Sequence, residues 1–282
     1  MIDDEVEREL SALTELAPLH NTPAIRAIEE SRRVLPDIPH VAVFDTAFHA
    51  TLPAEASTYA LPRRWREEWG IRRYGFHGLS VQWAAEKVSV PRLVVCHLGG
   101  GCSVTAVRDG RSVETTMGFT PLEGVPMATR PGSIDPEIVL YLLRHELASA
   151  AEIEDTLERK SGLLGLSEAS ARVEQLELAE DPDARLALDV FCYRVASAVG
   201  ALTVPLGGLD ALVFTAGVGE GSASVRERVC ERLAHLGVEL DPESNRAADG
   251  DAEISAPGAA VRIVVVRARE DLIAARAVRA VL

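Results

Sequence analysis

The feature that most constrains the fold is a succession of three β-branched runs, LVVCHLGGG, CSVTAVRDG and RSVETT, between Arg92 and Thr116. Short runs of this kind, bounded by turn residues, are typical of strands. Asp109 and Gly110 join the last two runs, and this dipeptide suits the positive backbone angles of a tight hairpin. The segment therefore predicts a three-stranded meander.

The chain after the meander alternates between helical and strand patterns. A helix is expected from Asp135, and a long helix from Asp183 to about Leu206. The remaining patterns predict, in order, a strand in ALVF, a helix in SASVRERVCERLAHLG, a strand in VRIVVV and a last helix in EDLIAARAVRAVL. A meander followed by this alternation predicts an α/β fold, in which helices cover a mixed sheet.

The front of the chain reads as a shorter αβ unit. Helical spacing ends at Pro36 and is followed by HVAVFDTAF, which predicts a strand that ends near Asp45. No strand pattern precedes it that could pair with it. This predicted strand is therefore expected to have an unpaired edge.

The charge balance excludes several partner classes. The 282 residues include 29 basic and 43 acidic ones, a net charge of −14, whose field would repel phosphate backbones and anionic membranes. We therefore expect neither a nucleic-acid partner nor a membrane surface. The four cysteines form no CxxC pair, which indicates reduced thiols in the cytoplasm and no zinc cluster.

No targeting or membrane-spanning segment is expected. The first residues are acidic, where a secretory signal would be basic and then apolar. The most apolar region, Val195–Gly219, is interrupted by Pro205 and Asp210, which favours a buried helix followed by a strand over a membrane span.

Two glycine-rich segments have the composition of phosphate-binding loops. Leu98–Gly101 lies between two predicted strands, and Thr215–Gly221 precedes a predicted helix that Ser222 could cap. Bare glycine amides allow a phosphate to approach the backbone. Taken alone, the first segment fits a hairpin without a ligand at least as well, and the second lacks a complete P-loop or GxGxxG pattern.

Several polar residues have a structural and a functional interpretation. Asp45 and His49 stand at the end of the predicted strand HVAVFDTAF, where side chains commonly reach a crevice, but an aspartate there also caps turns. His77 stands in the basic and aromatic segment RRYGFHG, which could bind an anion or be structural. Arg130, in ATRPGSIDP, could clamp an oxyanion or be solvated.

These segments occur in one order, and in that order the chain resembles the acetate kinase family, of the acetate and sugar kinase and actin-like superfamily. The most specific stretches are VAVFDTAFHATLP, RRYGFHGLS, VCHLGGGCSVTAVRDG, TTMGFTPLEGVPMATRPGSIDP, SGLLGLS and LGGLDALVFTAGVGE. The resemblance implies an actin-like ATPase (ribonuclease H-like) fold and a cytoplasmic homodimer. It also implies an enzyme that transfers phosphate from ATP to acetate and forms acetyl phosphate.

The resemblance further implies roles for the matching positions. It assigns the transfer step to three catalytic residues, Asp45, His77 and Arg130. The metal, Mg²⁺ or Mn²⁺, would be held by two carboxylates, those of Asp45 and Glu270. Acetate would bind in a pocket formed by Leu19, His20, Phe76 and Pro121. The nucleotide, ATP or ADP, would bind to His97, Gly99, Gly100, Gly101, Gly217, Gly219 and Glu220.

The chain also departs from the family pattern. Gly100 stands where the family has asparagine, and Ala171–Glu174 and Gly221 replace residues on the nucleotide side. The family's first strand, its serine-rich phosphate hairpin and a second arginine find no match before Met1. We therefore expect impaired activity; propionate kinase, butyrate kinase and a non-catalytic nucleotide-binding fragment are the alternatives.

The resemblance implies two domains. Residues 1–46 would be the remnant of a first, substrate and phosphate domain that lacks its N-terminal strands, with the helix 270–282 returning to it. Residues 47–269 would form a complete second domain for nucleotide binding and dimerisation.

Overall fold

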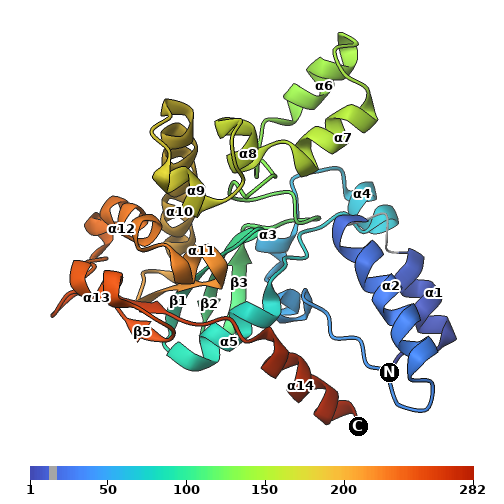
Figure 1. Cartoon of the computed structure of the whole chain (residues 1–282). Coiled ribbons are helices and arrows are strands. Elements are labelled where there is room, and N and C mark those ends of the chain that lie inside the picture. Colours follow the sequence, from blue (N-terminus) through green and yellow to red (C-terminus); the bar gives the residue numbers. More distant parts are fainter. Residues whose placement is uncertain (13–17) are drawn as a thin grey trace.

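The computed structural model describes residues 1–12 and 18–282, with the backbone alone for residues 18–21 (Figure 1). Its strands are β1 (Arg92–Leu98), β2 (Cys102–Arg108), β3 (Arg111–Thr115), β4 (Ala211–Thr215), β5 (Ala252–Glu253) and β6 (Arg262–Val265). The helices before the sheet are α1 (Asp4–Ala12), α2 (Pro18–Val34), η2 (Ala47–Thr51), α3 (Ala54–Ser57), α4 (Arg63–Trp69) and α5 (Gly78–Val88).

The later helices lie between and after the strands. They are α6 (Pro136–Arg144), α7 (Ala150–Arg159), α8 (Gly162–Ser167), α9 (Val173–Leu178), α10 (Pro182–Leu206), α11 (Ala216–Gly221), α12 (Ala223–Arg232), η3 (Ala234–Leu236), α13 (Pro242–Ala247) and α14 (Glu270–Val281). The alternation of helices and strands predicted after the meander is confirmed, and Asp135 caps α6 through its side chain.

The described residues contain one six-stranded sheet with the order β3-β2-β1-β4-β6-β5. The meander pairs antiparallel, whereas β1 pairs in parallel with β4 and β4 with β6. The predicted hairpin turn is confirmed, since Asp109 has φ 49° and Gly110 has φ 76°. The mixed sheet of an α/β fold is therefore present.

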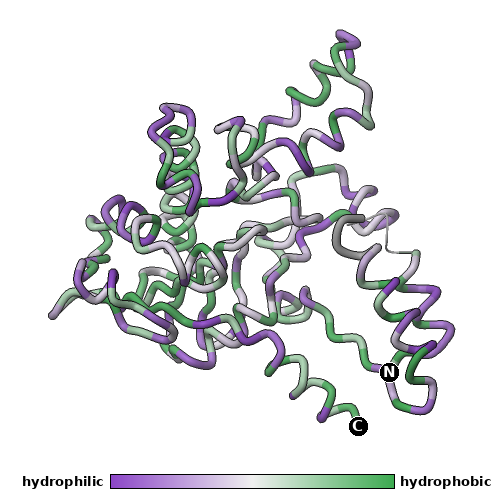
Figure 2. The backbone as a smooth tube through the Cα atoms, viewed as in Figure 1, coloured by the Kyte–Doolittle hydropathy of each residue, from purple (hydrophilic) through white to green (hydrophobic). Residues whose placement is uncertain are grey.

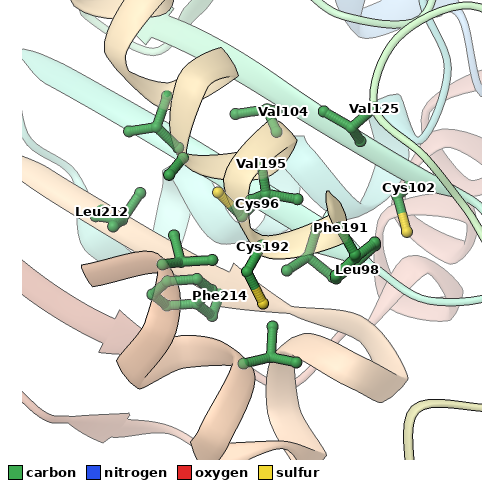
Figure 3. Close-up of a cluster of buried hydrophobic side chains, with 14 of the residues drawn as sticks. Cys96, Leu98, Cys102, Val104, Val125, Phe191, Cys192, Val195, Leu212 and Phe214 are labelled. Carbon is green, nitrogen blue, oxygen red and sulfur yellow. The ribbon is translucent and has the colours of Figure 1, made fainter. Parts of the chain in front are cut away.

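Side chains of the central strands alternate between two apolar layers. In β1, Val94, Cys96 and Leu98 join the larger core beneath α10 and α12. Leu93 and Val95 point to the opposite layer, which α5 and α14 cover. Figure 3 shows the larger core, where side chains of α10 and of the strands interleave. Because both faces are buried, the parallel strands are apolar at most positions, and their charged or polar residues, such as Arg92, Thr215 and Arg262, stand at their ends.

One described helix, α10, is long and apolar enough to cross a membrane by length and composition alone. Phe191, Val195 and Val199 on its inward face are fully buried against the sheet. This face makes α10 the central core helix of the larger layer, as the sequence predicted.

The prediction of a strand in HVAVFDTAF is wrong. Residues 39–44 have no regular structure, and the segment continues into a turn and the short helix η2. A strand forms only with a hydrogen-bonding neighbour. This segment has no strand partner within the described part of the chain; Ile2 N donates to His40 O at 2.8 Å.

The second glycine-rich segment, predicted as a loop, also differs. Residues 216–221 form the short helix α11, and Ser222 caps the following helix α12, as expected. Ala216 starts α11 with φ 66°, a left-handed conformation that costs a non-glycine residue about 1 kcal/mol or more. The sequence AGVGEG gave no sign of a helix because glycine has low helix propensity.

The C-terminal helix α14 packs on α5. Ile273 is buried in the same apolar layer as Val81 and Trp83, and Arg276 forms an ion pair with Glu86. This places the start of α14, at Glu270, near the start of α5. The division into domains 1–46 and 47–269 stays a prediction.

Candidate active site

The glycine turn between β1 and β2 forms the floor of the candidate site. Gly99 N donates to Gly101 O at 3.0 Å, which closes the turn. A Cβ at Gly100 would meet nothing within 4 Å, so the backbone there is open to a ligand. A Cβ at Gly101 would lie 2.8 Å from Nη2 of Arg130 and 3.2 Å from Nε2 of His77. Glycine at this position therefore lets both side chains approach the turn.

Asp45 is fixed at the N-terminus of α5. Its Oδ2 accepts from the backbone N–H of His77 at 2.6 Å, and Oδ1 accepts from Leu79 N at 3.2 Å. The backbone oxygen of Asp45 accepts from Gly78 N at 2.8 Å, and a Cβ at Gly78 would overlap that oxygen. The carboxylate thus satisfies the first amides of a helix, where negative charge is stabilised.

His77 and His97 form a stacked pair beside this cap. Their ring centroids are 4.0 Å apart and the rings are inclined by 17°. His77 Nδ1 lies 3.0 Å from Ser103 Oγ, and His97 Nδ1 lies 2.9 Å from Ser80 Oγ. With Nδ1 engaged, Nε2 of His77 is the ring atom that faces the glycine turn. His77 itself has φ 61°, so a left-handed backbone turn places its ring there.

Burial sets the protonation of the inner histidine. The His97 side chain is only 8% exposed, and this desolvation, followed by repulsion from His77, lowers its pKa well below the usual range. His97 is therefore neutral at neutral pH and accommodates a neighbouring positive charge.

Arg130 is held at the same edge of the sheet. Arg130 is only 8% exposed, and its Nη1 donates to the carbonyl of Pro121 at 2.7 Å. Desolvation by burial is the main cause of its lowered pKa, yet a guanidinium stays protonated in proteins. The alternative of a solvated arginine is excluded by this burial.

Glu270 stands at the first position of α14, across from Asp45. Desolvation raises the pKa of the Glu270 carboxyl, and the neighbouring Asp45 carboxylate raises it further. Among the described residues no group of three or more His, Cys, Asp or Glu could hold a metal ion alone. Two repelling carboxylates fit a cation whose other ligands come from a substrate.

The two glycine-rich segments lie side by side. A Cβ at Gly99 would be 3.5 Å from Cβ of Ala216, the first residue of α11. Gly217 is exposed with nothing near its Cβ position, whereas Gly219 is buried against Phe214. Glu220 does not point into the open space. Its Oε1 accepts from Ala216 N at 2.8 Å and from Ala268 N at 2.9 Å.

The predicted acetate pocket is described in part. Phe76 is half-buried against the core, and Pro121 is buried, with its carbonyl accepting from Arg130. Leu19 and His20 lie in the first turn of α2, and their side chains lie outside the described residues. Their role in the pocket stays a prediction.

His49, which the sequence placed near a crevice, is a structural histidine. It is 1% exposed, and its ring nitrogens lie 2.8 Å from Ser112 Oγ and 2.9 Å from the Phe76 carbonyl oxygen. Burial lowers its pKa. The predicted strand end does not exist, so the expected crevice position is lost with it.

Three further residues shape the site without having been predicted. Ser80 and Ser103 orient the two histidines. Arg226 is 1% exposed and donates to the carbonyls of Gly219 and Glu220 at 3.0 and 2.7 Å, which ends α11. The serines adjoin the motifs FHG and GGGC, which could have signalled them, but nothing in the sequence near Arg226 marks it as buried.

A positive guanidinium, an imidazole and bare backbone therefore meet opposite two carboxylates. The Acetokinase family profile matches residues 1–276. The chain belongs to this family. It is 46% identical to the acetate kinase of Carboxydothermus hydrogenoformans over 98% of this chain and 72% of that protein. The acetate kinase of Methanosarcina acetivorans is 45% identical over 98% of this chain and 70% of its own length.

Solved structures of kinases in this family have the same fold. The Porphyromonas gingivalis acetate kinase matches with a TM-score of 0.89 and 36% identity, over 98% of this chain and 72% of that one. A Francisella tularensis propionate kinase matches with a TM-score of 0.89 and 38% identity, over 96% and 72%. The predicted family and its actin-like α/β fold are thereby confirmed.

The buried histidines predict a loss of stability in mild acid. Below pH about 6.5 the unfolded chain binds protons that His97 and His49 cannot bind in the folded state, so the free energy of unfolding decreases. Each histidine contributes up to about 1.4 kcal/mol per pH unit. In a His97→Asn variant, urea unfolding at pH 7.5, 6.0 and 5.0 should show a shallower decrease than in the parent.

The exposed His235 on η3 provides the matched control. His235→Asn should keep the pH dependence of the parent. An unchanged dependence in His97→Asn would contradict the neutral, buried state of His97.

Proposed function

We propose that the chain transfers the γ-phosphoryl group of ATP reversibly to the carboxylate of acetate, giving acetyl phosphate and ADP. The observation that carries the proposal is the convergence of Arg130 and His77 on Gly101, next to the open backbone of Gly100. Family membership and the acetate kinases among its relatives support it. The enzyme class is a phosphotransferase with a carboxyl group as acceptor.

Arg130 and His77 stabilise the phosphoryl group during transfer. Negative charge spreads over the equatorial oxygens of this group, and fixed positive or donating groups lower the barrier most when they need no reorganisation. The guanidinium is already fixed by burial and by the Pro121 carbonyl. His77 is fixed by Ser103 and by its stack on His97. Both side chains therefore act from set positions.

Asp45 and Glu270 hold the metal of the nucleotide, Mg²⁺ or Mn²⁺. When bound, the metal would neutralise part of the phosphate charge. The raised pKa of Glu270 supports this assignment, because one of its causes is the neighbouring carboxylate of Asp45. Asp45 also lies beside His77, so it is placed to position the attacking carboxylate.

His97 and Gly99–Gly101 face the phosphates, and Gly217–Glu220 lie towards the adenosine. Glycines with open space at Gly100 and Gly217 leave room for the nucleotide. Glu220 acts through the backbone, because its carboxylate holds the start of α11 to the segment after β6.

Phe76 and Pro121, with Leu19 and His20, enclose the methyl group of acetate. Propionate is the second candidate, because the chain matches the Francisella tularensis propionate kinase as well as it matches an acetate kinase. One methylene changes the discrimination by about 10- to 200-fold, so the width of this pocket decides between the acids.

We also propose a cytoplasmic location and two domains, 1–46 with 270–282 and 47–269, the second of which binds the nucleotide. The net charge of −14 favours small-molecule partners over nucleic acid and membranes.

The exposed face of α6 supports a homodimer. No residue of this helix is buried. Its apolar residues Leu140, Tyr141 and Leu143 are 51%, 51% and 41% exposed, and Leu147, just after the helix, is 62% exposed. Figure 2 shows this apolar helix projecting from the body of the molecule. An apolar face of this kind is covered by a partner in soluble proteins, and a second copy is the partner we propose.

Hydroxylamine trapping tests the activity. With ATP, Mg²⁺ and acetate, the chain should form acetohydroxamate, and Arg130→Ala should lower kcat by about 10²- to 10³-fold because a fixed charge is lost. Arg159→Ala, on the exposed end of α7, is the control that keeps full activity. Nucleotide-dependent thermal stabilisation without hydroxamate would favour the non-catalytic alternative. The impaired kinase activity expected from the sequence stays a prediction. The rate of hydroxamate formation by the parent chain tests it.

Mn²⁺ binding, followed by electron paramagnetic resonance in the presence of ADP, tests the metal site. Glu270→Gln should raise the Kd for Mn²⁺ by about tenfold or more, because one of two charged ligands becomes neutral. Glu243→Gln, on the exposed face of α13, should leave the Kd unchanged. Equal Kd values for both variants would exclude Glu270 as a metal ligand.

Sedimentation velocity tests the dimer. The parent should sediment as a dimer, and Leu140→Glu with Leu143→Glu should sediment as a monomer with unchanged circular dichroism. Leu178→Glu places the same charge on the 85% exposed end of α9 and should remain dimeric. A monomeric parent, or a dimeric double variant, would contradict the proposed face.

A further inference from the structure

A half-buried polar cluster outside the phosphate site joins two segments that carry site residues. The first segment, 73–77, ends in Phe76 and His77. The second, the loop 116–124 after β3, contains Pro121. Arg73, Glu123 and Tyr59 connect the two, and we call these three residues the Arg73 clasp.

Arg73 makes most of the contacts of the clasp. Its side chain is 16% exposed, and Nη1 donates to the carbonyls of Thr116 and Met117 at 3.0 and 3.1 Å. Nη2 donates to Glu123 Oε1 at 3.1 Å. The buried Nε lies 3.5 Å from Glu114 Oε1 and makes no hydrogen bond within the described residues. The guanidinium therefore holds both ends of the loop. It bonds to the carbonyls of Thr116 and Met117 at the start and to the carboxylate of Glu123 near the end.

Tyr59 completes the clasp from the segment after α3. Its hydroxyl donates to Glu123 Oε2 and accepts from Phe119 N at 2.9 Å. The guanidinium of Arg73 lies over the Tyr59 ring, 5.5 Å from its centroid. Burial and the bond to Glu123 raise the pKa of Tyr59, so the hydroxyl keeps its proton.

The backbone beneath the clasp leaves no space for adjustment. Tyr74 N and Gly75 N both donate to the carbonyl of Gly118, at 3.0 and 3.3 Å. A Cβ at Gly118 would overlap the Glu123 carboxylate and the Tyr59 hydroxyl. The two segments are thus in direct contact, and their separation is determined by these polar groups.

The clasp is connected to the site on both sides. Phe76 and His77 follow Arg73 by three and four residues. Pro121 precedes Glu123 by two residues, and the Pro121 carbonyl is the acceptor for Arg130 Nη1. A shift of the loop therefore moves Pro121 relative to Phe76 and moves the guanidinium of Arg130 with it.

We propose that Arg73, Glu123 and Tyr59 are positioning residues that set the gap between Phe76 and Pro121, and with it the length of carboxylate that the site accepts. The inference rests on the proposed function. None of the three touches the reacting atoms; they act through the loop that carries Pro121. A half-buried ion pair suits this role because removing one partner leaves the other charge uncompensated, which favours a shift of the loop.

The test compares acetate with propionate in both turnover and binding. Arg73→Met should raise the propionate-to-acetate ratio of kcat/KM by about tenfold, because a loosened loop admits one more methylene. Tyr59→Phe keeps the ring and removes the bond to Glu123, so it should raise the ratio in the same direction by a smaller factor. Arg73→Lys restores the charge and should recover part of the selectivity. The KM for ATP should stay unchanged throughout.

Arg63→Met, on the exposed face of α4, is the matched control and should keep the parent ratio. If Arg73→Met does not fold, Tyr59→Phe and Glu123→Gln provide the same comparison. An unchanged acid ratio in the folded variants would overturn the proposal, even where kcat falls equally for both acids.

Competition between the two acids in saturation-transfer NMR separates this proposal from the proposed function. A parent that binds the acids but does not turn them over would contradict the kinase activity alone. The clasp would then be judged by whether the variants change the ratio of bound propionate to acetate. A parent that binds neither acid would overturn both proposals.

Discussion

The candidate site depends on one interaction, the capping of α5 by Asp45. A segment without regular structure delivers this carboxylate to the first amides of the helix, at 2.6 and 3.2 Å. The helix in turn places His77 over the glycine turn and packs α14 against the sheet, which brings Glu270 towards Asp45. Without the cap, nothing would hold the two carboxylates in a fixed position relative to His77 and the glycine turn.

Burial gives these groups their chemical character. His97 is kept neutral beneath His77, whereas the Arg130 guanidinium stays protonated and is held in place by its bond to the Pro121 carbonyl. Interactions between charges are stronger where water is excluded, so a phosphoryl group would be stabilised more by this arrangement than by the same groups on a surface. The sheet holds this arrangement rigidly, because His97 and the glycine turn lie at the end of β1.

The predictions that succeeded concern regular segments and motif order. The hairpin at Asp109 and Gly110, the core helix α10 and the strands β4 and β6 follow from turn chemistry and periodicity, which are local properties. HVAVFDTAF failed because a strand also needs a neighbour, and its apolar pattern alone could not supply one. The prediction of a loop at Ala216–Gly221 failed for the opposite reason. Contacts from Glu220 and Arg226 overcome the low helix propensity of the glycines, so the helix α11 forms.

The sequence by itself determined the family, and it pointed to Asp45, His77, Arg130 and the glycine turn, because motif order and glycine positions are written along the chain. Only the tertiary structure decided what each residue does there: Asp45 caps a helix, His49 is structural, Glu220 braces α11, and Arg73 holds the loop of Pro121. These roles arise from contacts between residues far apart in the chain, such as Arg73 and Glu123, 50 positions apart, and His49 and Ser112, 63 positions apart. Hydrogen-bond partners at such separations follow from packing, and no local pattern encodes them.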